Sequence, residues 1–212
     1  GANATFALAN TVDGDTAGTR SLTISANGSG STVTLGDAVG ATNRLSAFDI
    51  TGTTISFNGP TVNTTGNQSY AGALTLGANT TLSASNLQTV SGSVFEGAGK
   101  SLSIVANATL DGVINNVSQF SVSGTTQLAG NVSSTGNQTY TGAITLGGDS
   151  ALLANGINAV ITTSGAINSD GTTRSLTFTA SGANSTLVFN EAIGNTAAIG
   201  SLNATASNIT LN

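Results

Sequence analysis

The chain repeats its own sequence, and this feature constrains the fold more than any other. The segment GNQSYAGALTL at 66–76 returns as GNQTYTGAITL at 136–146. The segment RSLTISA at 20–26 returns as KSLSIVA at 100–106 and as RSLTFTA at 174–180. Self-similarity at a fixed period indicates a repeat architecture in which each unit covers the core of the next.

The spacing of these segments defines a unit of roughly 75 residues, long enough for several short strands. We predict three copies, at 1–76, at 77–146 and an incomplete one at 147–212, that together form one continuous array. The third copy stops before any counterpart of the GNQ-Tyr segment. We therefore expect the chain to be part of a longer array.

Inside each copy, apolar and polar residues alternate in short bursts, as in Thr32–Leu35 and Thr53–Phe57. Glycine, asparagine, aspartate and serine separate the bursts. Alternation over four to eight residues between turn formers predicts β-strands, and no longer stretch has helical spacing. The chain is therefore predicted to be all-β. The expected strands include Leu22–Ile24, Thr32–Leu35, Ile55–Phe57, Ala73–Leu76, Ala143–Leu146 and Leu176–Thr179.

Composition excludes several functional classes. The 212 residues include no His and no Cys, so a Ser-His-Asp or Cys-His nucleophile, a common zinc site and a disulfide framework are ruled out. Four Lys and Arg against nine Asp and Glu give a net charge of -5. Such a chain lacks the positively charged surface that nucleic-acid binding requires. No apolar run approaches the ~18 residues of a membrane span. We predict no enzymatic activity, no cofactor, no nucleic-acid partner and no membrane insertion.

Two architectures can use such a unit. Each copy could be a separate β-sandwich, like beads on a string, although linkers and bulky core anchors are missing. A right-handed parallel β-helix needs neither, because turns of about 20–25 residues bury small apolar side chains against their neighbours. We favour this β-solenoid, with equivalent residues three or four turns apart. One continuous core should then contain Ile24, Phe57, Leu76, Ile104, Leu146, Phe178 and Phe189.

Acidic residues supply two candidate sites. Asp13 and Asp15, with Gly14 between them, could form half of a calcium loop. Their equivalents in the other copies are not both acidic, so a solvated turn is the preferred interpretation and no metal site is predicted. Paired carboxylates for glycoside hydrolysis are the alternative enzymatic hypothesis. The nine acids are scattered along the chain, which argues against it.

Other candidates recur at one position of the repeat. Tyr70 and Tyr140 could be an exposed platform for sugars, but an aromatic ring that fills the thin core is the preferred interpretation. Three cations that precede the SL strands could contact a partner or pair with the preceding turn carboxylate, Asp15, Glu96 or Asp170. We favour the ion pairs. The structural repeat positions are Gly66, Asn67, Gln68, Tyr70, Gly136, Asn137, Gln138, Tyr140, Arg20, Lys100 and Arg174.

The phrases GTRSLTISANGSGSTVTLGDAVG, TTGNQSYAGALTLGANTTL and SDGTTRSLTFTASG resemble the β-strand repeats of filamentous-haemagglutinin-like adhesins and autotransporter passengers of bacteria. The resemblance covers essentially the whole chain. It implies a right-handed β-helical stalk, secreted or displayed on the cell surface, that presents a distal binding region.

The sequence leaves three functions open. The first is this non-enzymatic stalk. The second is a subunit of a self-assembling extracellular fibre or sheath, in which identical subunits pair through open strand edges. The third is a carbohydrate- or surface-binding module. The expected partners are neighbouring repeats, identical subunits and host or surface glycans, and the expected location is extracellular.

Overall fold

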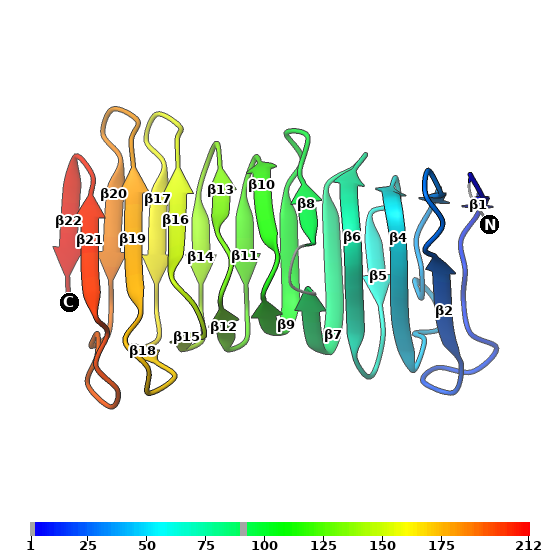
Figure 1. Cartoon of the computed structure of the whole chain (residues 1–212), viewed down its shortest axis with the longest axis horizontal. Coiled ribbons are helices and arrows are strands. Elements are labelled where there is room, and N and C mark those ends of the chain that lie inside the picture. Colours follow the sequence, from blue (N-terminus) through cyan, green and yellow to red (C-terminus); the bar gives the residue numbers. More distant parts are fainter. Residues whose placement is uncertain (1–2, 90–92) are drawn as a thin grey trace.

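A computed structural model describes residues 3–89 and 93–212, and all regular structure in these ranges is β-strand. Figure 1 shows the strands stacked side by side, with the two termini at opposite ends of the stack. In the part of the chain that is described, no helix has the length and apolarity needed to cross a membrane. The all-β prediction is confirmed, including strands at each of the expected positions.

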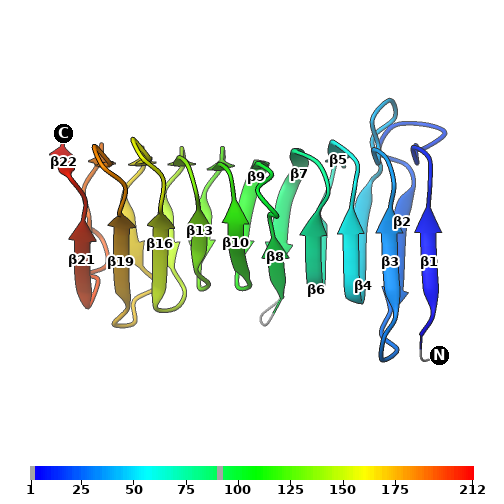
Figure 2. The same ribbon diagram turned by 90° about the horizontal axis from the view of Figure 1, so that it is seen from above.

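The strands form a parallel β-solenoid with turns of about 22 residues. The solenoid has three faces, which we name A, B and C, and the chain passes through them repeatedly in the order A, C, B. Each strand pairs in parallel with the strand one turn away on the same face. Figure 2 shows face A as an unbroken row of strands from β1 (Thr5–Leu8) to β21 (Ser201–Thr205). Four long strands bend from one face to the next, so each of them contributes to two faces.

The faces are defined by their strands. Face A contains β1 (Thr5–Leu8), β3 (Thr32–Leu35), the second half of β4 (Ala47–Phe57) and of β6 (Gln68–Leu76), β8 (Val94–Glu96), β10 (Val113–Val117), β13 (Val132–Ser134), β16 (Ser150–Ala154), β19 (Ser175–Ala180) and β21 (Ser201–Thr205). Face B contains β2 (Ser21–Ala26), the first half of β4 and of β6, the second half of β7 (Thr80–Thr89) and of β9 (Leu102–Leu110), β12 (Thr126–Leu128), β15 (Ile144–Leu146) and β18 (Ile167–Ser169). Face C contains β5 (Thr61–Asn63), the first half of β7 and of β9, β11 (Phe120–Val122), β14 (Gln138–Tyr140), β17 (Val160–Thr163), β20 (Thr186–Phe189) and β22 (Asn208–Leu211).

The core is one axial column of apolar side chains. Along each strand, buried residues alternate with exposed or half-buried ones, because successive side chains of a strand point to opposite faces of the sheet. All seven side chains expected in the core belong to a single buried cluster that extends from Ile24 to Phe189. The continuous parallel pairing and the single core contradict separate β-sandwiches and confirm the solenoid.

The turns differ in length along the stack. Ser103 and Ser121, which are 18 residues apart, lie on consecutive turns in the middle of the molecule. Asn155 and Ser181, near the C-terminal end, are 26 residues apart and also lie on consecutive turns. The strands stay in register because the extra residues lie in the connecting loops.

Asparagine and aspartate side chains connect one turn to the next. The side-chain oxygens of Asn79, Asn131 and Asp149 accept hydrogen bonds from the backbone N–H groups of Ser101, Ala151 and Ser175, at 3.0, 2.8 and 2.8 Å. Each accepting residue precedes a strand, and each donor lies at the corresponding position one turn on. The side chains therefore extend the parallel ladder beyond the ends of the strands.

Successive copies of a sequence motif lie on different faces. Leu22 of the first SL segment is on face B, Leu102 of the second on face C and Leu176 of the third on face A. Starting at Leu22 on face B, three complete turns bring the chain past Phe48 and Gln68 to Leu87 on the same face. The chain then runs along face A and reaches Leu102 on face C. The expected separation of three or four turns is therefore confirmed, with a rotation about the axis that the sequence did not indicate.

Candidate functional site

The repeated Gln and Tyr of the GNQ-Tyr segment form a buried hydrogen-bonded unit. The Tyr70 hydroxyl donates to Gln68 Oε1 at 2.7 Å, and the Tyr140 hydroxyl donates to Gln138 Oε1 at 3.0 Å. Both rings are inside the core, at 1% and 0% exposure. The preferred interpretation of core-filling aromatics is confirmed, and the alternative of an exposed platform for sugars is wrong. Burial raises the pKa of both tyrosines well above the ordinary value of 10.0.

The glutamine amide of this unit joins two turns. Gln138 Nε2 donates to the carbonyl oxygens of Val132 and Leu153, at 3.3 and 2.7 Å, and to Ser134 Oγ at 3.1 Å. Gln68 Nε2 makes the equivalent set of bonds, to Val62, Thr64 and Ser83, at 3.0, 3.3 and 2.9 Å. A buried amide must be satisfied in this way, since an unpaired one is costly. The unit is structural.

The Gly and Asn of the same segment also have structural roles. A Cβ atom on Gly66 or Gly136 would lie 2.4 or 2.5 Å from the carbonyl oxygen of Ser46 or Ser118, one turn back. Only glycine permits the turns to approach this closely. Asn137 Oδ1 accepts the backbone N–H of Val160 at 2.9 Å, and Asn67 Oδ1 accepts the hydroxyl of Ser85 at 3.0 Å.

Two of the three recurrent cations make the expected ion pairs. Arg20 and Arg174 bind Asp15 and Asp170 through two hydrogen bonds each, with the shorter at 2.8 and 2.7 Å. Arg174 lowers the pKa of Asp170 to about 2. The third pair differs, because the Glu96 carboxylate accepts the backbone N–H of Ala98 and no ion pair joins it to Lys100 in the described ranges.

The acidic candidates Asp13 and Asp15 bind other groups of the chain. Asp13 Oδ1 accepts the backbone N–H groups of Thr42 and Asn43, at 3.0 and 3.3 Å, which fixes the loop of the following turn. Asp15 is held by Arg20, which also lowers its pKa. Within residues 3–89 and 93–212, no group of three or more acidic side chains is placed to hold a metal ion. The two aspartates act as turn residues here.

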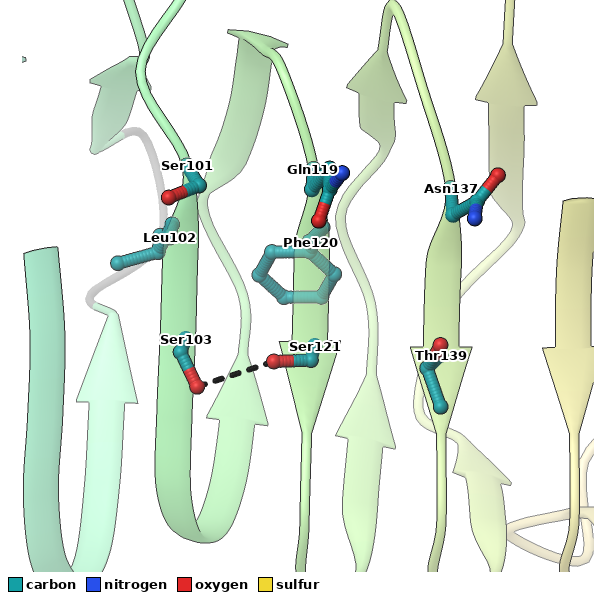
Figure 3. A pocket seen from close by; sticks show the side chains of 8 residues that line it. All are labelled: Ser101, Leu102, Ser103, Gln119, Phe120, Ser121, Asn137 and Thr139. Atoms are coloured by element: carbon teal, nitrogen blue, oxygen red, sulfur yellow. Dashed lines mark hydrogen bonds between the residues drawn. The ribbon is translucent and has the colours of Figure 1, made fainter. Parts of the chain in front are cut away.

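Two grooves open on the surface, and each includes the Asn of one GNQ-Tyr segment. The first has a volume of about 210 Å³ on face C, where β9, β11 and β14 lie side by side. Figure 3 shows its outward side chains in two rows, Ser101, Gln119 and Asn137 in one and Ser103, Ser121 and Thr139 in the other, with Leu102 and Phe120 beneath them. The second, about 340 Å³ on face B, is lined by Asp49, Asn67, Gln68, Ser69, Asn86, Leu87, Gln88 and Thr109.

Sequence reasoning identified only part of these grooves. Asn67 and Asn137 belong to the repeated GNQ-Tyr segment and are among the predicted repeat positions, whereas Gln88 and Gln119 lie outside that segment. The available signal was the alternation itself, because residues between buried positions of neighbouring strands must share an outer face. The missing information was which strands are neighbours, and that depends on the turn length.

No protein-family model, no curated protein and no solved structure matches the chain.

Proposed function

We propose that the chain is part of the non-enzymatic stalk of a secreted or cell-surface bacterial adhesin. In this proposal it is a right-handed β-helix of three sequence copies, at 1–76, 77–146 and 147–212, that holds a distal binding region away from the cell. The observation that carries the proposal is the single axial core, which runs through the stack from Ile24 to Phe189. A rod in which each turn is fixed to the next transmits position and force along its axis.

Two further features support a structural role. The buried Gln–Tyr units and the Asn and Asp bonds between turns resist slippage of one turn over another. Four of the acids make local contacts, since Asp15 and Asp170 bind arginines and Asp13 and Asp37 accept hydrogen bonds from Thr42 and Thr11. This arrangement favours turns over catalytic pairs.

Electron cryotomography of intact cells, with a gold-labelled antibody against this chain, tests the proposal. A stalk predicts rods that project from the cell envelope with label along their shafts. Label confined to the cytoplasm would contradict it. Label along cell-free filaments would favour the second candidate function.

That second candidate is a subunit of an extracellular fibre, in which apolar side chains of the outermost described turns would lie between stacked subunits. Phe6 is 40% exposed at one end, and Leu202 and Leu211 are 43% and 74% exposed at the other. These two leucines line an open depression of about 450 Å³ together with Phe189 and Ile193. A fibre predicts that Leu211→Asp abolishes concentration-dependent association in sedimentation experiments, whereas a chain that is monomeric at all concentrations would exclude it.

A further inference from the structure

The two surface grooves share a chemistry that the structural role does not explain. They share part of the sequence repeat, because Asn67 and Ser69 in one correspond to Asn137 and Thr139 in the other. From Gln68 the chain makes three turns on face B, through Leu87 and Ala108 to Thr126, and then passes two faces to Gln138. At about 4.8 Å per turn, Gln68 and Gln138 are roughly 18 Å apart along the axis. The grooves lie on adjacent faces and both reach β9, whose Ser103 lines the first and whose Thr109 lines the second.

The groove surfaces offer hydrogen-bonding groups that the protein itself does not use. Gln119 is exposed and Thr139 is half-buried, and neither side chain makes a hydrogen bond within the described chain. In the second groove, Ser69 is half-buried and Gln88 is exposed, and neither side chain makes a hydrogen bond within the described chain. A hydroxyl offers one donor and two acceptors, and an amide offers two of each. These groups are available to a ligand.

The remaining lining residues hold the available groups in place. Asn137 is fixed by its bond to the backbone N–H of Val160. Ser121 donates to Ser103 Oγ at 3.0 Å, so these two hydroxyls are oriented across consecutive turns. Beneath them, Leu102 and Phe120 are 1% and 2% exposed and form a rigid floor. The surface is therefore preorganised, which lowers the entropic cost of binding.

Charge and shape define the class of ligand. The first groove has no charged lining residue, and the second has only Asp49. Both are shallow and cross several strands, so a ligand would lie along the rod and meet a new set of hydroxyls and amides about every 4.8 Å. A chain of sugar rings repeats on the same length scale and presents hydroxyl groups at each step. An anionic chain would gain no cationic partner here.

We propose that the two grooves are binding sites for an extended, neutral polysaccharide. Aromatic stacking does not contribute, because Phe120 is part of the buried floor, so each site depends on hydrogen bonds and is weak by itself. The presence of two sites on one rigid rod makes binding to a polysaccharide surface multivalent. The inference is independent of whether the rod is a stalk or a fibre subunit.

Titration of the isotope-labelled chain with cellohexaose, an extended neutral oligosaccharide, tests this inference by NMR. We expect millimolar binding, with amide shifts confined to the two grooves. Gln119→Ala with Thr139→Val should weaken binding at the first groove about tenfold, and Ser69→Ala with Gln88→Ala should do the same at the second. The matched control is Gln127→Ala with Thr145→Val, on face B outside both grooves, which should change neither.

Three results would overturn the inference. The first is the absence of shifts at millimolar cellohexaose. The second is a set of shifts that the groove variants leave intact. The third is equal binding of maltohexaose, which is coiled, or of an oligogalacturonate, which is anionic, because the grooves would then not select an extended neutral chain. Dispersed amide spectra of all variants would show that each one is folded.

Discussion

At the scale of single residues, the buried Gln138 joins four polar groups, those of Val132, Ser134, Tyr140 and Leu153. Gln138→Leu would leave the Tyr140 hydroxyl and the Leu153 carbonyl without the partners that they have now. We expect a loss of about 2–3 kcal/mol in the free energy of unfolding, measured with urea. Tyr140→Phe should cost only about 1 kcal/mol. The double variant should lose less than the sum, and strict additivity would show that the two side chains act independently.

The Asp170–Arg174 pair predicts a specific pH dependence. Arg174 holds the pKa of Asp170 at about 2, below the ordinary value of 3.8. The folded state therefore binds fewer protons than the unfolded state between these values, so the stabilisation is complete above 3.8 and is lost as the pH falls towards 2. Because the pair is partly exposed, the effect is small. Thermal midpoints of the native chain should fall more steeply over this range than those of Arg174→Gln, and parallel curves would contradict the prediction.

At the scale of strands and turns, the close approach of neighbouring turns restricts which residues can occupy a position. Gly136→Ala would place a methyl group 2.5 Å from the Ser118 carbonyl oxygen, and this backbone cannot move without shifting a turn. We expect a loss of about 1–3 kcal/mol in urea unfolding. Gly147→Ala is the matched control, because its new Cβ meets the mobile end of Gln127 at 3.2 Å. Equal stability of both variants would show that the turns can separate locally.

The strands themselves could be predicted from sequence, but their neighbours could not. Alternation in segments such as Thr32–Leu35 determines which side chains are buried, because a strand has two faces and one must cover the core. Pairing depends on the length of each turn, which ranges from 18 residues between Ser103 and Ser121 to 27 between Thr5 and Thr32, with the loops. Gln138 was identified only as a repeated position, since its partner Leu153 lies on the next turn and nothing local specifies it.

At the scale of the whole molecule, the sequence repeat and the structural repeat differ. One sequence unit spans three complete turns and then two of the three faces of the next turn. Because this is not a whole number of turns, each copy of a motif lies on a different face from the copy before it, as Leu22, Leu102 and Leu176 show. Equivalent surface features therefore point in different directions around the rod. A molecule built in this way presents the same polar groups to partners on more than one side.

The last prediction concerns cooperation between turns. Ile104 is 1% exposed in β9 and stacks between Leu82 and Val122 of the adjacent turns, so Ile104→Ala leaves a cavity bordered by both. We expect a loss of about 2–5 kcal/mol. Because each turn is stabilised by its neighbours, hydrogen exchange should accelerate in the turns on both sides, and the effect should decrease with distance along the axis. Val105→Ala, at an exposed neighbouring position, is the control and should leave exchange unchanged. Faster exchange confined to the turn that carries Ile104 would show that the turns are energetically independent despite their shared core.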